Sequence, residues 1–177
     1  MDIVKTINIV SSTSSLVIFL VAILFLVAIE TRGAYHEKVR RLVIEKIGFI
    51  GLVISGGALV LSIIYSNFLG YPPCNLCWWA RIFLYPQILV FAFVLSNRYD
   101  RKTLLDTSIG LSILGVIFSG YHTLITYTGN EFIACGTTGS CTQRFVYEYG
   151  FVTIPLMALI SFVTIIISSY YAKKSVS

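Results

Sequence analysis

The sequence predicts an all-α membrane protein with five transmembrane helices. Hydrophobic residues make up 56% of its 177 residues, charged residues make up 12%, and the mean hydropathy is +0.85. Soluble domains carry about 25% charged residues, so little of this chain can form one. Five apolar runs approach or exceed the roughly 20 residues that a helix needs to cross a bilayer. Helices are expected because an open sheet edge would leave backbone groups unpaired in lipid.

The five expected spans follow one another with short polar connections. They are residues 7–29, 47–69, 78–96, 106–128 and 151–172. The first run has an alternative interpretation as a cleaved signal peptide. No Ala-x-Ala-like cleavage site is evident, and the basic stretch that follows would have to cross the membrane, so a retained helix is expected. Pro86 and Pro155 fall inside expected spans and should bend them.

Most basic residues lie in the connections on one side of the expected spans. Ten of the 13 Lys and Arg residues lie in the first and third connections and the C-terminal tail: Arg32, Lys38, Arg40, Arg41, Lys46, Arg98, Arg101, Lys102, Lys173 and Lys174. The positive-inside rule places these ten in the cytoplasm and the second and fourth connections outside. The net charge of +5 therefore reports topology, and no nucleic-acid partner is expected.

Four cysteines form two pairs on the side expected to face outward. Cys74 and Cys77 form a Cys-x-x-Cys motif, and Cys135 and Cys141 lie in a later loop rich in Gly and Thr. Disulfides persist in an oxidising compartment, and two such pairs suggest electrons passing from one to the other. Structural staples and a zinc site of all four cysteines are alternatives. No metal is predicted.

The Cys-x-x-Cys motif lies where one helix ends and the next begins. Pro72 and Pro73 should end the preceding helix, which puts Cys77 at or near the start of the third span. A helix N-terminus stabilises a thiolate, the nucleophile in disulfide exchange. Arg81 lies about one turn deeper on the same face, where it could stabilise that thiolate and an anionic reduced acceptor. A simple interfacial anchor is the other interpretation of Arg81.

Three further residues are candidates for binding a flat acceptor. Trp78 and Trp79 fit the aromatic belt at a membrane interface, with a second possible use as an aromatic wall for a cofactor. His122 lies in the outer part of the fourth span, and ionisable residues inside spans are usually functional. It could donate a proton or a hydrogen bond to a reduced quinone, or only join two helices.

At these residues the sequence resembles the DsbB family of disulfide-bond-forming membrane proteins. It is most similar to the short-loop form of Gram-positive bacteria, called BdbC. The matching stretches are residues 73–78, Arg81-Ile82, Tyr85-Pro86, Tyr121-His122, the loop with Cys135 and Cys141, and residues 150–155. The resemblance extends from about residue 47 to the C-terminus. One departure is Ala80, where the family usually has a polar residue.

The resemblance implies both a fold and a location. Residues 47–177 would form a four-helix transmembrane bundle with two external cysteine-bearing loops. Residues 1–46 would add an extra N-terminal transmembrane helix and a basic cytoplasmic loop, whose role stays open. The protein would lie in a prokaryotic plasma membrane with its redox sites facing outward.

The resemblance also implies a quinone-dependent thiol:disulfide oxidoreductase. It would reoxidise an extracytoplasmic thioredoxin-like thiol oxidase of the DsbA or BdbD kind and reduce a membrane quinone, ubiquinone or menaquinone. Cys135 or Cys141 would accept the mixed disulfide with the partner, and Cys74 and Cys77 would reoxidise that pair. Cys77 would face the quinone and Arg81 would help bind it. Spacing does not say which loop cysteine the partner attacks.

Two other functions fit parts of the sequence. A relative of vitamin K epoxide reductase would share the four-helix plan, but there the loop cysteines usually precede the Cys-x-x-Cys motif. A structural membrane protein with stapled external loops would keep its cysteines oxidised and would tolerate replacement of Arg81.

Overall fold

The computed structural model describes residues 3–30, 34–130 and 141–176, and it is helical through nearly all of them. The helices are α1 (Ile3–Glu30), α2 (Ala34–Ile63), the π-helical turn η1 (Ile64–Phe68), α3 (Asn75–Ser96), α4 (Arg101–Thr128) and α5 (Ile154–Val176). Each of the five α-helices contributes a segment that is long and apolar enough to cross a membrane. The predicted all-α membrane fold is confirmed.

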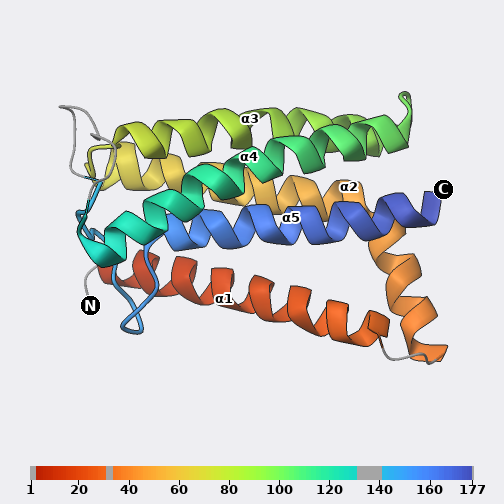
Figure 1. Cartoon of the computed structure of the whole chain (residues 1–177), viewed down its shortest axis with the longest axis horizontal. Helices are drawn as coiled ribbons and strands as arrows, with labels where there is room; N and C mark the ends of the chain where they lie inside the picture. Colours follow the sequence, from red (N-terminus) through yellow and green to blue (C-terminus); the bar gives the residue numbers. More distant parts are fainter. Residues whose placement is uncertain (1–2, 31–33, 131–140, 177) are drawn as a thin grey trace.

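Helices α2 to α5 form a four-helix bundle, and α1 lies outside it. Neighbours in the bundle are α2 and α3, α3 and α4, α4 and α5, and α5 and α2, which closes the ring. Helix α1 packs along α5 and, less extensively, along α2 (Figure 1). The first turns of α2 run across the end of the bundle before the helix enters it (Figure 1). The predicted plan of four helices plus one is therefore confirmed.

All five helices start at other residues than the expected spans, and two of these starts bear on the site. Helix α3 begins at Asn75, ahead of the expected start at Trp78, and Cys74 is its N-cap with φ −75° and ψ 170°. Helix α5 begins at Ile154, so Pro155 is its second residue. Proline is tolerated there because the first amides of a helix have no intrahelical acceptor. The expected bend at Pro155 is therefore wrong, whereas Pro86 does lie inside α3.

Small and polar side chains join the helices of the bundle. A Cβ at Gly51 would lie 2.3 Å from the ring of Phe91, and one at Gly115 would lie 2.5 Å from Phe162. Such close approach is typical of membrane helices, which gain stability from packing rather than from hydrophobic burial. The fully buried Gln87 donates to the Ser108 carbonyl at 3.0 Å and to Ser112 Oγ at 2.6 Å, and this connects α3 to α4.

The segment between Cys141 and α5 is held against the outer end of α4. Arg144 donates from Nε to the Thr126 carbonyl at 2.9 Å and from Nη2 to the Tyr127 carbonyl at 3.1 Å, which satisfies carbonyls at the end of that helix. A tight turn follows, in which Tyr149 and Gly150 have φ of 56° and 78°. The turn leads directly into α5 and fixes the backbone before it.

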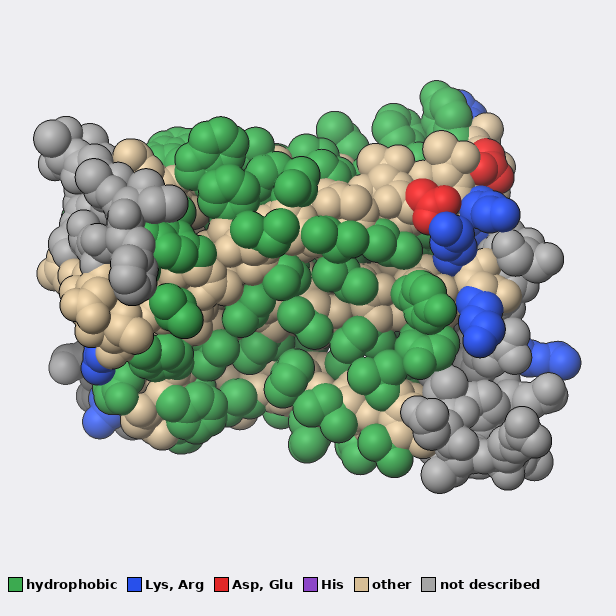
Figure 2. Space-filling model, viewed as in Figure 1, with side chains coloured by type: hydrophobic (Ala, Val, Ile, Leu, Met, Phe, Trp, Pro, Cys, Tyr) green, Lys and Arg blue, Asp and Glu red, His purple; other side chains and the backbone are tan. Residues whose placement is uncertain are grey.

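Charged side chains gather at the two ends of the molecule and an apolar surface lies between them (Figure 2). At the end where α3 meets α4, Lys173 pairs with Asp106. The exposed side chains between the ends are largely Val, Leu, Ile and Phe. This distribution is that of an integral, multi-pass membrane protein.

Candidate functional site

Cys74 and Cys77 lie together at the N-terminus of α3. Both are free thiols, and their sulfur atoms are 3.4 Å apart. Cys74 is only 3% exposed, and its carbonyl accepts the first hydrogen bond of the helix, from the Trp78 amide at 3.2 Å. The Cys-x-x-Cys spacing thus places Cys74 at the N-cap and Cys77 in the first helical turn, and the sequence had predicted only that Cys77 lies near the helix start.

Cys141 and His122 complete a buried cluster around Cys74. The His122 Nε2 atom is 3.6 Å from Cys74 Sγ. The two sulfurs of Cys74 and Cys141 and a ring nitrogen of His122 lie within 4.8 Å of one another. Cys141 is disulfide-bonded, and the other half of its bond lies outside the described residues, as does the candidate Cys135. The structure thus brings one cysteine of each pair to the same place.

The backbone around Cys141 is fixed by α4. Thr126 Oγ1 donates to the Cys141 carbonyl at 3.2 Å, and the same hydroxyl contacts the His122 carbonyl one turn earlier at 2.8 Å. Cys141 is 1% exposed and packs against Ile125 and Cys74. A loop cysteine that is far from Cys74 in sequence is therefore held against it by a helix.

The environment of Cys74 favours its thiolate form. When this sulfur is deprotonated, the Cys77 thiol donates a hydrogen bond to it, and this contact holds the pKa of Cys74 well below its usual range. Burial acts in the opposite direction, and His122 adds a further lowering. The thiolate is the reactive species in disulfide exchange, so Cys74 is the more reactive thiol of the pair when both are reduced.

Arg81 is buried and held by α2. Its Nε donates to Ser62 Oγ at 2.8 Å and its Nη2 to the Ser62 carbonyl at 3.0 Å. The guanidinium carbon also lies 5.2 Å from the centre of the Trp78 ring. Arg81 is 8% exposed and lines the same cavity as Cys77. A solvated interfacial anchor does not describe this residue, because its head group is fixed between two helices.

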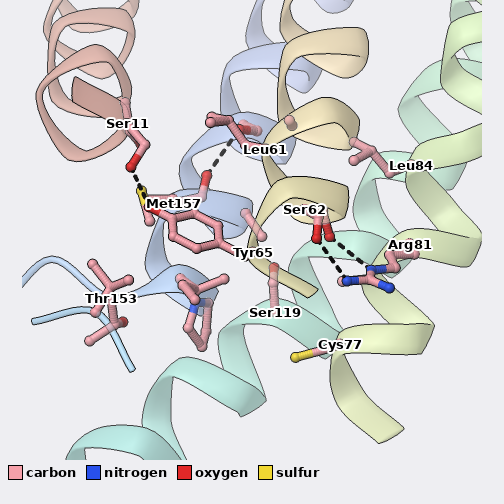
Figure 3. A pocket seen from close by; sticks show the side chains of 18 of the residues that line it. Ser11, Leu61, Ser62, Tyr65, Cys77, Arg81, Leu84, Ser119, Thr153 and Met157 are labelled. Atoms are coloured by element: carbon pink, nitrogen blue, oxygen red, sulfur yellow. Dashed lines mark hydrogen bonds between the residues drawn. The ribbon is translucent and has the colours of Figure 1, made fainter. Parts of the chain in front are cut away.

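A cavity of about 550 Å³ opens beside these residues. Its walls are mainly apolar, and its polar members include Cys77, Arg81 and His122. Figure 3 shows Cys77 and Arg81 on one side of this space and Tyr65 and Ser11 across from them. The volume is within the range of roughly 300–1,000 Å³ that is typical of sites for small organic molecules.

The two tryptophans lie outside the described lining of this cavity. Trp79 stacks on Phe118, with ring centres 5.2 Å apart, and is 45% exposed. Trp78 is 49% exposed and reaches the site only through its contact with Arg81. Of the four predicted acceptor-binding residues, the cavity therefore unites Arg81 and His122, while the tryptophans fit the membrane-interface interpretation.

Sequence analysis missed several residues that support the site. Ser62 holds Arg81, Thr126 holds Cys141, and Arg144 fixes the end of α4. Ser62 and Thr126 could have been found in the sequence as polar residues inside apolar spans, because such groups usually have a hydrogen-bond partner within the membrane. Which partner each one has depends on how the helices meet.

Residues 40–172 match the family described as disulfide bond formation protein DsbB. This chain belongs to the DsbB family. It is 30% identical to probable disulfide formation protein C 2 of Bacillus cereus over 122 residues. This alignment covers 68% of this chain and 86% of the relative. It is also 35% identical to the SPbeta prophage-derived disulfide bond formation protein B of Bacillus subtilis over 105 residues. That alignment covers 59% of this chain and 70% of the relative. No solved structure matches the chain.

Membership of the DsbB family confirms the resemblance recognised in the sequence. The protein is a membrane-embedded oxidoreductase of the disulfide-forming kind. The matched region begins at residue 40, so α1 lies outside it. All the cysteines lie inside the matched region.

Proposed function

We propose that this protein is a quinone-dependent thiol:disulfide oxidoreductase that reoxidises an extracytoplasmic thioredoxin-like dithiol protein. The observation that carries the proposal is the position of Cys74, whose sulfur lies within 4.8 Å of the Cys141 sulfur and 3.4 Å from that of Cys77. Cys77 in turn lines the membrane cavity. The three sulfurs form a path from an external loop to a space that suits a lipid-soluble acceptor.

The internal step is a thiol–disulfide exchange between the two pairs. After the partner has reduced the loop disulfide, the Cys141 thiolate attacks Cys74 of an oxidised Cys74–Cys77 bond. The bond between Cys141 and Cys74 forms, and Cys77 leaves as a thiolate. The second loop cysteine then attacks Cys141 and releases Cys74, so two electrons have moved from the loop pair to the Cys-x-x-Cys pair.

Burial suggests which loop cysteine meets the partner. Cys141 is 1% exposed and lies against Cys74, so a folded partner protein cannot reach its sulfur. We therefore assign the mixed disulfide with the partner to Cys135 and the internal exchange to Cys141. The domain division at residues 46 and 47 and the outward orientation of this end of the molecule belong to the same proposal.

The residues around the cavity fit a quinone acceptor. A quinone would take up two electrons from the Cys74 thiolate and the Cys77 thiol as they form a disulfide, and two protons, one from the Cys77 thiol and one from water. Arg81 makes two hydrogen bonds to Ser62, and its remaining N–H groups are available to an acceptor oxygen. His122 lies beside Cys74 and also lines the cavity, where it can hold a proton during the exchange.

The test is quinone reduction by the purified protein supplied with a reduced thioredoxin-like partner. The wild-type protein should reduce quinone. Cys74→Ser and Cys77→Ser should not, because neither variant can form the Cys74–Cys77 disulfide. Arg81→Ala should raise the quinone KM more than it lowers kcat. If wild type turns over no quinone while its cysteines remain in stable disulfides, a structural protein with stapled loops is the better description.

The proposed exchange partners can be trapped directly. In a variant with Cys77→Ser and Cys135→Ser, only Cys74 and Cys141 remain, and mild oxidation should join them in a disulfide that peptide mass spectrometry detects. The matched control carries Cys77→Ser and Cys141→Ser and should form this kind of bond more slowly. Faster bond formation in the control would contradict the assignment of Cys141.

A further inference from the structure

The buried group of Cys74, His122 and Cys141 has the composition of a metal site. It joins three parts of the chain: the N-cap of α3, helix α4 and the segment before α5. The three residues are 3%, 7% and 1% exposed. Thiolate and imidazole are the ligands that Zn²⁺ and other thiophilic ions take in proteins, whereas Mg²⁺ and Ca²⁺ prefer oxygen. The residue types therefore point to an ion such as Zn²⁺.

The spacing of the three ligand atoms also suits this ion. Zn–S distances of about 2.3 Å and Zn–N distances of about 2.0–2.1 Å place the ligand atoms of a tetrahedral site roughly 3.5–3.8 Å apart. Cys74 Sγ and His122 Nε2 are already 3.6 Å apart, and the two sulfurs and a ring nitrogen all lie within 4.8 Å of one another. A contraction of about 1 Å at most would bring them to bonding distance of one ion.

The surroundings favour a neutral metal complex on a fixed backbone. Two thiolates and a neutral imidazole balance the charge of Zn²⁺, so the complex adds no net charge beside the apolar side chains of Ile125 and Leu76. Thr126 Oγ1 contacts both the His122 and the Cys141 carbonyls, which holds these two ligands on α4 before any ion binds. Ligands that are already positioned cost less free energy to order on binding.

We propose that the fully reduced protein binds one Zn²⁺ ion through Cys74 Sγ, Cys141 Sγ and a ring nitrogen of His122, with water as the fourth ligand. Cys141 is disulfide-bonded in the structure, so the site forms only after the loop pair has been reduced. Both sulfurs bind as thiolates, any thiol proton passes to water, and no electrons move. This site differs from a zinc site of all four cysteines, because it uses a histidine and one cysteine of each pair.

Bound Zn²⁺ blocks the internal exchange, a consequence that rests on the proposed function, whereas the site itself does not. The ion occupies Cys74 and Cys141, the two sulfurs between which the exchange takes place. The reduced protein is thereby held in a resting form until the ion is removed. Zinc ions outside the membrane would then limit how fast the protein transfers electrons.

The test measures metal binding by the full-length variant with Cys77→Ser and Cys135→Ser, kept reduced in detergent. Co²⁺ is the first probe, because it replaces Zn²⁺ in such sites and shows charge-transfer absorption when thiolates bind it. The variant should bind one Co²⁺ ion with this absorption, and Zn²⁺ should displace it. Adding His122→Ala should weaken Zn²⁺ binding by at least about tenfold, because losing even a residue that supports a metal ligand costs about this much.

The matched control carries Cys77→Ser and Cys141→Ser, so it also keeps two thiols and His122 but lacks one proposed ligand. It should bind Zn²⁺ at least about tenfold more weakly. Equal affinity in the two double variants, or bound Co²⁺ without thiolate absorption, would overturn the site. This comparison decides the site even where the His122→Ala variant does not fold.

Blocked exchange is tested in the same variant with Cys77→Ser and Cys135→Ser. Zn²⁺ should prevent mild oxidation from joining Cys74 to Cys141, and a chelator should restore the disulfide. Disulfide formation at an unchanged rate with Zn²⁺ bound would overturn the block. If the protein binds Zn²⁺ as expected but wild type reduces no quinone, the site stands and the proposed function falls. Quinone reduction without Zn²⁺ binding would leave the proposed function intact and remove the site.

Discussion

Cys74 is the residue on which the chemistry of the site converges. It caps α3, contacts Cys77 and His122, and lies beside the disulfide of Cys141. Sequence spacing indicated that the Cys-x-x-Cys motif lies at a helix start, but it placed the reactive position at Cys77. The structure makes Cys74 the N-cap, because the helix begins directly after it.

The lowered pKa of Cys74 predicts an unusual pH dependence of its alkylation. In the form with Cys74 and Cys77 reduced, the thiolate of Cys74 should persist as the pH falls from 8 to 6, since its pKa lies well below its usual range. Its rate with iodoacetamide, followed by peptide mass spectrometry, should change less than about twofold. An ordinary thiol with a pKa of about 8.5 would slow roughly 75-fold over this range.

Cys77→Ala provides the control for this pH profile. It removes the hydrogen bond that contributes most to the lowered pKa of Cys74. The alkylation rate of Cys74 in this variant should therefore fall more steeply as the pH decreases. Identical profiles for wild type and Cys77→Ala would show that the Cys77 thiol does not stabilise the Cys74 thiolate.

At the scale of single elements, α4 shows how closely the helices of the bundle approach. Gly115 faces Phe162 of α5, and Gly110 of the same helix has no neighbouring atom within 4 Å of a Cβ built there. Glycine is therefore needed at one position of α4 for packing, whereas at the other it only lowers helix propensity. The sequence alone does not distinguish the two glycines.

Gly115→Ala should destabilise the protein by about 1–3 kcal/mol, because the new methyl group would lie 2.5 Å from Phe162, a fully buried ring with little room to move. Gly110→Ala should be neutral or stabilising by up to about 1 kcal/mol. The midpoint of thermal unfolding in detergent, followed by circular dichroism, measures both. A midpoint for Gly115→Ala equal to that of Gly110→Ala would contradict the packing argument.

The turn between α2 and α3 also belongs to this scale. Helix α2 changes to the π-helical turn η1 directly after Ser62 and Ile63. Such turns are frequent at functional sites. Here η1 carries Tyr65 into the cavity wall one turn after Ser62, which holds Arg81. On either side of the start of this turn, Tyr65 contacts Ser11 of α1 and Ser62 contacts Arg81 of α3, two contacts between helices that the local sequence does not predict.

At the scale of the whole molecule, the basic residues define an orientation. Arg101, Lys102 and Lys173 lie at the end opposite to the cysteines, where Lys and Arg gather in Figure 2. From the positive-inside rule we predict that the cysteine end lies outside the cell. This orientation suits disulfide formation, because the outer compartment is oxidising.

Single-cysteine reporters in a variant without native cysteines test this orientation. Asn130→Cys lies after α4 at the cysteine end, and Tyr99→Cys lies before α4 at the other end; both positions are exposed. A membrane-impermeant maleimide should label Asn130→Cys in intact bacterial cells and Tyr99→Cys only after permeabilisation. The reverse labelling pattern would show that the redox site faces the cytoplasm.

The sequence by itself determined the number of helices and the membrane setting, and it singled out the four cysteines as candidate reactive groups. These follow from hydropathy over whole segments and from residue type, which need no knowledge of neighbours. It also named Arg81 and His122, because an ionisable residue inside a span must have a partner or a role.

Only the tertiary structure decided which groups meet. It set Cys141 beside Cys74, gave Arg81 its contact with Ser62, and placed α1 against the cavity that Cys77 lines. These contacts join residues from different helices, and their positions depend on crossing geometry and close packing rather than on local sequence. For the same physical reason, Trp78 and Trp79 lie outside the cavity that Cys77 lines, although they directly follow Cys77 in the sequence.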